Sequence, residues 1–438
     1  MIERIQVKKL FGLYDYDVTM SQSPAVKILT GPNGYGKTTM LLAINHLYRS
    51  DFWYFHFLDF EQMTIILSEQ VVDIRKRNKA AVLANDENRA DETDANVYEE
   101  KVTLLDKEGR EIETVVVTEE YVLSLVYDTR RRVALREPQQ FSDEELLARY
   151  YTQRDDDYML EHSRNISLAL QEYETKYLPA QRQYNNATWI QREYRPMRYY
   201  HYEIDHVNDE ICTLYRRTQN AFASNSQRID ATFISRLVKR ENSYSKNELQ
   251  NKLDELKKRM DGFKELNLFS NMELLDYSLE EGASYEKLDT ALSLYVDDMN
   301  AKMDKFEELY QKMSLYKRVV TNKVLSEKTI DFSEEGLSVT NTNGRKLRDL
   351  HKLSSGEQNL LILYYNLIFK SNRKTILLID EPENSLHVAW QSKMLDDYMD
   401  MAETTGCQIL MATHSPTFIN GRWDLTTDLY RQYKEKDA

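Results

Sequence analysis

The sequence has few of the residues that mark secreted or membrane proteins. Its 438 residues include two cysteines, Cys212 and Cys407, too few for a disulfide framework or a cysteine-ligated metal site, and both are expected to be reduced thiols. No apolar run approaches the roughly 20 residues that a membrane-spanning helix needs. The first residues, 1–5, lack the charged-then-apolar layout of a signal peptide. We therefore expect a cytoplasmic protein without membrane contact.

Glycine is also scarce, at 12 residues, whereas tyrosine is abundant, at 30. The apolar fraction of 41% and the charged fraction of 30% are typical of a globular chain, here long enough for two or three domains. The net charge of −14 excludes bulk electrostatic binding of DNA, although a local basic groove would still attract phosphates. Because glycine is scarce, each glycine-rich segment is informative.

The most informative glycines follow a short apolar segment, 25–30, that is typical of a buried strand. The loop 31–39 comes next, and an apolar helical pattern then runs over 40–48. Strand, glycine loop and helix are the context of a Walker A motif, in which backbone N–H groups and a helix N-terminus surround phosphates. The motif predicts a lysine on the β- and γ-phosphates and a hydroxyl on Mg²⁺. The residues expected to bind ATP are Gly31, Pro32, Asn33, Gly34, Gly36, Lys37, Thr38 and Thr39, with Thr38 as the Mg²⁺ ligand.

A second apolar segment, 375–379, lies far downstream and ends in two acids, Asp380 and Glu381. A continuous apolar run suits a parallel strand that is buried on both faces. Acids at the end of such a strand are typical of a Walker B motif. We expect Asp380 to help hold Mg²⁺ and Glu381 to act as the general base that polarises the attacking water.

Two further segments complete the pattern. The segment 353–358 precedes an apolar helical stretch, so that Ser354 and Gly356 would open a helix and form an anion site, with Glu357 beside them. The strand expected at 408–412 ends in a polar loop that carries His414. In this order His414 is expected to sense the γ-phosphate.

Together these segments resemble the ABC ATPase superfamily, with Walker A at 31–38, the signature at 353–358, Walker B at 376–381 and a switch histidine at His414. The resemblance covers residues 1–50 and 320–425. It implies an α/β, P-loop NTPase head with an antiparallel β lobe, and an enzyme that hydrolyses ATP to ADP and phosphate with Mg²⁺. The catalytic residues would be Glu381, His414 and Lys37. It further implies an ATP-sandwich homodimer, in which Lys37 and Ser354 of opposite chains meet at one γ-phosphate.

Details of the motifs favour one branch of that superfamily. The signature contains Ser-Gly-Glu-Gln where transporters typically have Gly-Gly-Gln, which resembles the chromosome-maintenance and DNA-repair branch. The segment 383–387 ends in His387, where transporters usually have aspartate, and resembles OLD-type and RecF-like ATPases. No Q-loop stands out, and the candidates are Gln62, Gln139 and Gln140.

The adenine contacts are equally open. Phe11 or Tyr14 would stack near the base, but each would serve as well in the core. The run Arg130–Arg132 is more typical of a solvated face than of a site. An arginine- and tyrosine-rich segment, 182–202, suits a nucleic-acid contact, a protein interface or packing within the insertion.

About 300 residues separate Lys37 from Ser354. Two β-rich segments, 97–105 and 111–117, predict a hairpin, and the preceding acidic stretch 86–94 is expected to be a solvated loop. From 142 to 316 the pattern is helical. A helical pair of a few turns each is expected at 248–256 and 287–315, with Leu288, Leu292 and Tyr295 on one stripe, and strands at 328–345.

Three regions follow from this division. Residues 1–135 are expected to hold the N-terminal half of the head with its β lobe, 136–325 a mainly helical insertion, and 326–438 the C-terminal half of the head. Only 24 residues follow His414, too few for the Toprim nuclease domain of OLD-type nucleases. If nucleic acid is cut, a separate polypeptide is expected to do so.

The segment 9–14, this Walker A, the chain length and the late signature resemble the ATPase component of the PARIS anti-phage defence system, and Septu-type ATPases share the motifs. That resemblance implies a larger homo-oligomer that holds a Toprim-type effector and releases it on sensing a viral protein. The function expected is thus a nucleotide-gated sensor and scaffold in antiviral defence. The alternatives are a DNA-engaging repair or recombination ATPase and, more remotely, a transporter subunit.

Overall fold

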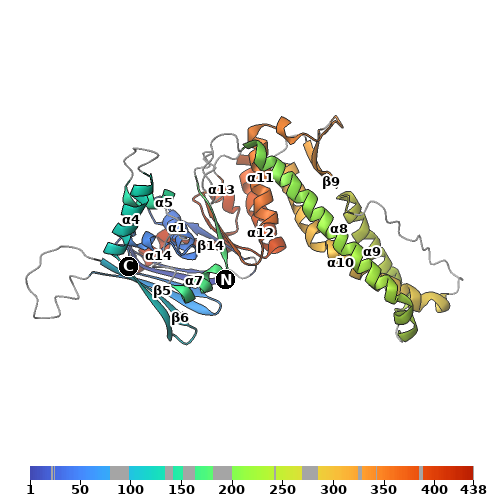
Figure 1. Ribbon diagram of the computed structural model, residues 1–438, viewed down its shortest axis with the longest axis horizontal. Helices are drawn as coiled ribbons and strands as arrows, with labels where there is room; N and C mark the ends of the chain where they lie inside the picture. The colour runs from blue at the N-terminus through green and yellow to red at the C-terminus, as the bar shows by residue number, and fades with distance from the viewer. Residues whose placement is uncertain are drawn as a thin grey trace, which may run out of the picture. The chain divides into compact units, whose positions relative to one another are not determined.

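The computed structural model describes residues 1–20, 23, 25–78, 98–133, 142–150, 163–180, 200–240, 243–268, 285–323, 328–341, 343–383 and 388–437. The chain divides into two compact units. The first contains Met1–Arg192 and Asn372–Ala438, and the second contains Glu193–Ser371. Both units are drawn in Figure 1.

A five-stranded parallel sheet forms the centre of the first unit. Every residue of β12 (Thr375–Asp380) is buried, which confirms the prediction that this strand is covered on both faces, and β13 (Gln408–Ala412), the strand expected at 408–412, is fully buried too. Helix α1 (Lys37–Tyr48) packs against three of the strands. The strand order is β14 (Thr426–Asp428), β3 (Val26–Thr30), β13 (Gln408–Ala412), β12 (Thr375–Asp380) and β8 (Glu174–Leu178).

Strand β8 corrects the helical pattern expected between residues 142 and 316. It pairs in parallel with β12, with Thr175 beside Ile376. It lies at the edge of the sheet and only its last residue, Leu178, is buried. Its short sequence, Glu-Thr-Lys-Tyr-Leu, therefore lacks both the alternation and the apolar run that predict strands.

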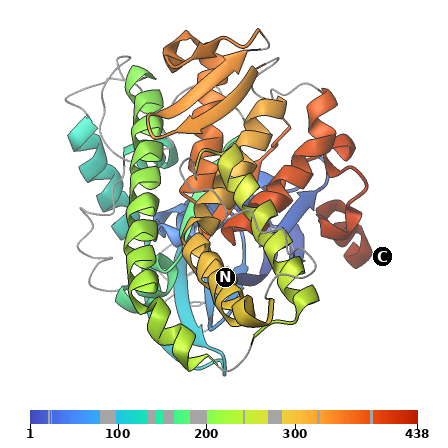
Figure 2. The same cartoon turned by 90° about the vertical axis from the view of Figure 1, so that its right-hand side faces the viewer.

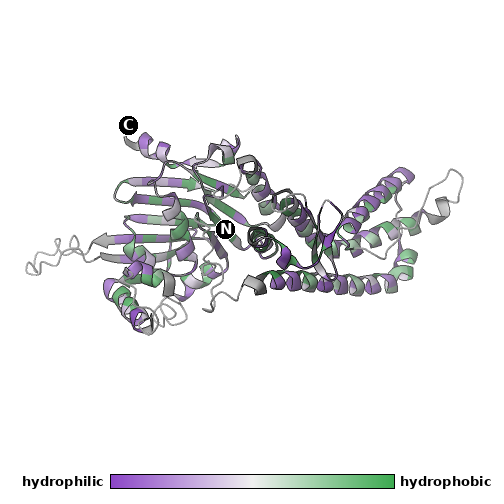
Figure 3. Ribbon diagram, turned by 90° about the horizontal axis from the view of Figure 1, so that it is seen from above, coloured by the Kyte–Doolittle hydropathy of each residue, from purple (hydrophilic) through white to green (hydrophobic). Residues whose placement is uncertain are grey.

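A six-stranded antiparallel sheet supplies the β lobe of the same unit. Buried and partly buried residues alternate along β4 (Gln62–Leu67), as expected for a strand with one face on the core. Figure 3 colours the chain by the hydropathy of each residue. The predicted hairpin is confirmed as β6 and β7, whereas the acidic stretch 86–94 lies outside the described residues. The strand order is β2 (Tyr14–Thr19), β1 (Ile2–Leu10), β4 (Gln62–Leu67), β5 (Gln70–Asn78), β6 (Tyr98–Asp106) and β7 (Glu111–Thr118).

Helices complete the first unit and close a shared core. Buried side chains from α1, both sheets and the short helices form one apolar cluster, so the two sheets are held together through α1. The remaining helices are α2 (Trp53–Phe57), α4 (Glu119–Val133), α5 (Asp143–Tyr150), α7 (Arg164–Gln171), α12 (Val388–Thr405), α13 (Pro416–Ile419), η3 (Trp423–Leu425) and α14 (Leu429–Asp437).

The second unit combines helices with a small antiparallel sheet (Figure 2). Its two longest helices pack together, and the sheet contacts one through β10 and the other through β9. The strands expected at 328–345 are confirmed, and helices lie at the two places where they were expected. The elements are α8 (Tyr200–Lys239), α9 (Lys246–Glu265), α10 (Tyr285–Lys323), β9 (Lys328–Ser333), β10 (Gly336–Asn341), β11 (Lys346–Leu347), η2 (Leu350–Lys352) and α11 (Ser355–Phe369).

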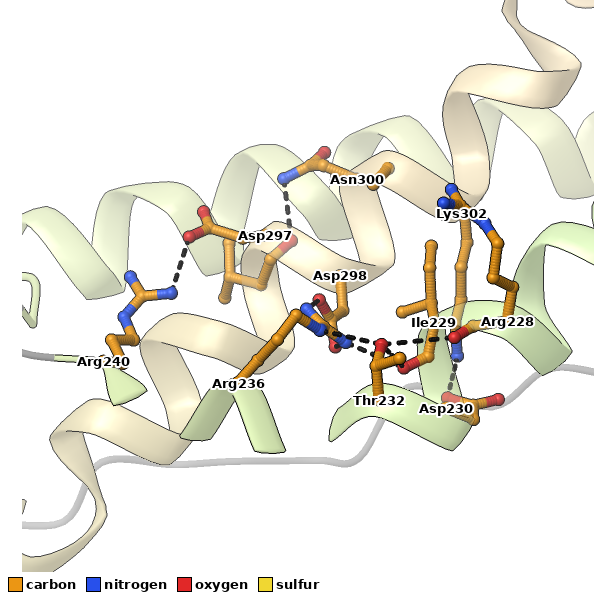
Figure 4. A network of polar contacts seen from close by, with 12 residues as sticks. Arg228, Ile229, Asp230, Thr232, Arg236, Arg240, Asp297, Asp298, Asn300 and Lys302 are labelled. Carbon is orange, nitrogen blue, oxygen red and sulfur yellow. Dashed lines mark hydrogen bonds and ion pairs between the residues drawn. The ribbon is translucent and has the colours of Figure 1, made fainter. Parts of the chain in front are cut away.

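The pair expected at 248–256 and 287–315 is α9 and α10, and the expectation of only a few turns each is wrong, because these helices have 20 and 39 residues. Helix α8 is not part of the expected pair. Helices α8 and α10 have 40 and 39 residues, or about 60 Å each at 1.5 Å per residue. Polar pairs lie between them: Arg236 donates to Asp298, and the Lys302 Nζ lies 2.7 Å from Oδ1 of Asp230 (Figure 4). These charged residues interrupt the apolar stripe, so the periodicity understates the length. Among the described residues, no helix has the length and apolar character needed to cross a membrane.

Candidate active site

The loop between β3 and α1 has the tight backbone that the glycine spacing predicts. Gly34 and Gly36 both have positive φ, at 89° and 79°. A Cβ on Gly36 would lie only 2.6 Å from Cδ2 of Leu10, so no other residue fits without displacing that side chain. The hydroxyl of Tyr16 donates to the carbonyl oxygen of Tyr35 over 2.9 Å and holds the middle of the loop.

Lys37 is buried at the start of α1. Its Nζ donates to the carbonyl oxygens of Gly31 and Pro32, over 2.8 and 3.0 Å. The ammonium therefore lies against the first residues of the loop, within reach of an anion that the loop would bind. Burial lowers the pKa of Lys37, and nearby acids act in the opposite direction: Glu381, Asp380 and Glu383.

A hydrogen bond joins the two predicted Mg²⁺ ligands across 342 positions of sequence. Oγ1 of Thr38 donates to Oδ2 of Asp380 over 2.9 Å. Burial raises the pKa of Asp380, which lies at the end of β12, and its Oδ1 accepts no hydrogen bond from the described residues. A hydroxyl beside a buried carboxylate oxygen without a donor is a pair of hard oxygen ligands, so these residues fit Mg²⁺.

Glu381 has a strained backbone. Its φ of 45° lies in the left-handed region, which is unfavourable for glutamate, and its N–H donates to the carbonyl of Ala412 over 2.8 Å. Its Oε1 lies 2.9 Å from Nδ1 of His414. The His414 side chain is 59% exposed and that of Glu381 only 13%. The predicted base and the predicted switch residue therefore contact each other, with the histidine facing solvent.

Glu383 is a functional candidate that the sequence did not single out. It is buried, and its Oε1 accepts a hydrogen bond from Oγ1 of Thr413. Ligand atoms of Glu381, Glu383 and His414 lie within 4.8 Å of one another. Burial raises the pKa of Glu383 to about 7, and the neighbouring Glu381 adds to the shift. The only sequence signal was its place two residues after the Walker B glutamate.

Replacement of Glu383 by glutamine should remove a pH-dependent loss of stability. A carboxyl group with a pKa of about 7 in the fold and about 4.5 when unfolded favours the folded state at low pH and loses that contribution as pH rises through 7. The variant should therefore gain about 1–2 kcal/mol over the wild type between pH 4.5 and 7, which is less than the full pKa shift corresponds to because solvent screens part of the charge. Urea unfolding at several pH values measures this, and a difference that stays flat from pH 5 to 8 would contradict it.

Aromatic residues surround the outer side of the phosphate loop. The ring of Tyr14 lies 5.2 Å from those of both Tyr35 and Tyr433, whereas Phe11 is 38% exposed. Of the two candidate adenine contacts, Tyr14 is thus packed among tyrosines and Phe11 is accessible. Helix α14 also bonds to the lobe, since Gln432 donates to the Asp17 carbonyl and accepts from its N–H. The C-terminal helix therefore buttresses the loop.

The signature segment lies in the second unit. Ser354 is the N-cap of α11, as its position predicts, and it forms a capping box with Glu357. Glu357 also pairs with Lys328 of β9, with Nζ and Oε1 2.7 Å apart. Gly356 lies in the first turn of α11. The helix N-terminus expected at the signature is therefore present.

The Q-loop candidates and the arginine-rich segments do not join this site among the described residues. Gln62 lies within β4, where its amide donates to Asp73 over 2.6 Å and its oxygen accepts from Lys8. Gln62 therefore links neighbouring strands of the antiparallel sheet. Arg130 pairs with Asp143 at the surface. Gln139, Gln140, 182–199 and 384–387 lie outside the described residues, and of 200–202 only the helical backbone is described.

The fold and this site together define a P-loop ATPase head, in which a phosphate loop and two acids follow β3 and β12, two parallel strands of one sheet with β13 between them. Residues 1–419 match the family model AAA_15, described as an AAA ATPase domain, and the chain belongs to that family. Membership makes it a nucleotide-binding ATPase. Among curated proteins no match was found.

Similar solved structures include SMC heads. One is the Smc head domain with an extended coiled coil, bound to the C-terminal domain of ScpA, from Pyrococcus furiosus. It is 13% identical in sequence, the match covers 95% of this chain and 90% of that chain, and the TM-score is 0.33. Another is the SMC head domain from Thermotoga maritima, which is 10% identical, with a match that covers 95% of this chain and 90% of that chain and a TM-score of 0.30. The assignment to the class rests on the family and the site, not on these.

Proposed function

We propose that this chain binds ATP with Mg²⁺ and hydrolyses it at the site built by Lys37, Thr38, Asp380 and Glu381. The hydrogen bond between Thr38 and Asp380 carries the proposal, because it joins the phosphate loop to the strand that ends in the candidate base. A chain with two unrelated motifs would have no reason to bring these residues together.

The chemistry follows from the side chains. Lys37 would exchange its loop carbonyls for phosphate oxygens, and Thr38 and Asp380 would hold Mg²⁺, which neutralises phosphate charge when bound. Glu381 would accept a proton from the attacking water, and its contact with His414 keeps the carboxylate oriented. Because His414 is exposed, it is available to respond to the γ-phosphate or to a second chain.

The signature serine gives the first direct test. We propose that two chains enclose ATP, so that the partner subunit's Ser354 completes each site. Ser354→Arg should leave ATP binding to one chain within about twofold, yet lower turnover about 10²-fold, because the side chain blocks closure and removes a donor. Steady-state kinetics measures the turnover, and light scattering with and without ATP measures whether the dimer closes. Normal turnover in the variant would contradict the closed dimer.

The role we propose for the ATPase is a nucleotide-gated sensor and scaffold that controls a separate effector, a Toprim-type nuclease, in antiviral defence. The residues 9–14, the phosphate loop that follows and the late signature support it through their resemblance to AriA, the ATPase component of the PARIS system. The two long helices of the second unit support it too, since they give the chain a surface beyond the ATPase motifs.

Purification of tagged Glu381→Gln with its native flanking genes tests this role. The eluate, with and without ATP, is analysed by mass spectrometry and by the ratio of nucleic acid to protein absorbance. A stoichiometric nuclease-like neighbour would support the scaffold. Nucleic acid without any protein partner would instead favour a DNA-engaging repair ATPase.

A further inference from the structure

We infer that Lys328 is a positioning residue for the signature serine: it neutralises Glu357, so that Ser354 can approach a phosphate. The inference rests on the proposed function, in which Ser354 contacts the nucleotide of a partner chain. Lys328 lies outside every motif that the sequence marks, at the first position of β9.

The two oxygens of Glu357 have separate partners. Oε2 accepts from the backbone N–H of Ser354 over 2.9 Å and from its hydroxyl over 2.8 Å. Oε1 accepts from Nζ of Lys328 over 2.7 Å. The carboxylate therefore links the lysine on one side to the serine on the other, and its place is set by both.

The charge of Glu357 would otherwise oppose nucleotide binding. Burial disfavours its ionisation, but hydrogen bonds from Lys328 and Ser354 outweigh burial and lower the pKa of Glu357, so the group is an anion at neutral pH. An anion within hydrogen-bond distance of the Ser354 hydroxyl would repel a γ-phosphate that the same hydroxyl is to contact. The ammonium of Lys328 cancels that charge and weakens the hold of the carboxylate on the hydroxyl.

The surroundings fix the position of Lys328. Strand β9 is packed against α10, and the hydroxyl of Tyr316 on α10 donates to the carbonyl of Leu361 on α11 over 2.9 Å. Asn208 of α8 accepts from the N–H of Leu337 on β10 over 2.8 Å. Lys328 and α11 are thus held by the same two helices, α8 and α10, which maintains the 2.7 Å contact between Lys328 and Glu357.

Lys328→Met tests the inference, because methionine keeps the apolar stem and removes only the charge. We expect kcat/KM for ATP to fall about five- to twentyfold, with binding of a fluorescent ATP analogue to the single chain unchanged. Lys328→Arg should restore most of the rate. Lys317→Met is the matched control, since Lys317 pairs with Asp331 of the same strand at similar exposure and lies outside the signature; it should stay near wild type.

The double variant separates charge from structure. Glu357→Gln keeps an acceptor for Ser354 without the negative charge, so adding Lys328→Met to it should cost nothing further. Equal losses in both backgrounds, or no loss from Lys328→Met alone, would overturn the inference. Ser354→Arg separates a failure of the proposed function from a failure of this inference. Normal turnover of Ser354→Arg would contradict the proposed function. An inactive Ser354→Arg together with a normal Lys328→Met would overturn only the role of Lys328.

Discussion

Replacement of Glu381 by glutamine should give a protein that binds ATP but barely hydrolyses it. The amide retains the shape of the side chain and its contact with His414, yet it cannot take a proton from water. Loss of a general base lowers turnover by about 10²- to 10⁴-fold. Because product is no longer formed, ATP-bound dimers should accumulate. Phosphate release measures the rate, and size-exclusion chromatography with light scattering measures the dimer.

A double variant provides the control for trapping. Glu381→Gln combined with Lys37→Ala should stay monomeric at the same ATP concentration, because a dimer that depends on nucleotide needs the phosphate contacts of the loop. Turnover of Glu381→Gln within about threefold of wild type would remove Glu381 from the base assignment. Glu383 would then be the next candidate for the base, because it is buried and one of its carboxylate oxygens lies within 4.8 Å of a ring nitrogen of His414.

The parts of the site that sequence could predict are those in which one local pattern specifies both structure and chemistry. The apolar run of β12 predicted a fully buried parallel strand, and the acids at its end then had to meet the loop after β3, because parallel strands of one sheet expose their carboxyl ends at the same edge. The contact between Thr38 and Asp380 is the outcome of that geometry.

The parts that sequence missed depend on partners far away in the chain. Glu383 is buried and accepts a hydrogen bond from Thr413, which lies 30 positions further along the chain, so the sequence around residue 383 does not predict this contact. Lys328 is one lysine among many until β9 brings it to Glu357. Strand β8 carries too few apolar residues for a pattern, and its place is decided by pairing with β12. These are tertiary effects that override local propensity.

The length of α10 was underestimated, and α8 was not expected as one long helix, for a related reason. Arg236 is bonded to Asp298, and Lys302 to Asp230, at positions where an uninterrupted apolar stripe would signal a long helical pair. Paired charges fill such positions without apolar side chains, provided that their hydrogen bonds are satisfied. The buried Asp298 meets that condition through two bonds from Arg236.

Lys37→Ala should abolish nucleotide binding at the site rather than slow the reaction. The ammonium is buried and interacts electrostatically with Asp380, Glu381 and Glu383, so its removal leaves these three acids without its positive charge. Phosphates would lose charge-assisted hydrogen bonds and meet uncompensated carboxylates, and affinity should fall at least about 10²-fold. Titration calorimetry with ATP and Mg²⁺ measures this directly.

Lys27→Ala is the matched control for that experiment. Lys27 lies on β3, immediately upstream of the loop, and burial likewise lowers its pKa, but its Nζ donates to the carbonyl of Thr426, 3.3 Å away. Its loss should reduce stability while leaving ATP affinity within about threefold, because its ammonium bonds to a backbone carbonyl of the sheet and has no phosphate contact in the proposed site. If both lysine variants lost affinity equally, the effect would come from damage to β3, and the phosphate role of Lys37 would be withdrawn. If only Lys37→Ala lost it, the contact to phosphate would be the remaining explanation.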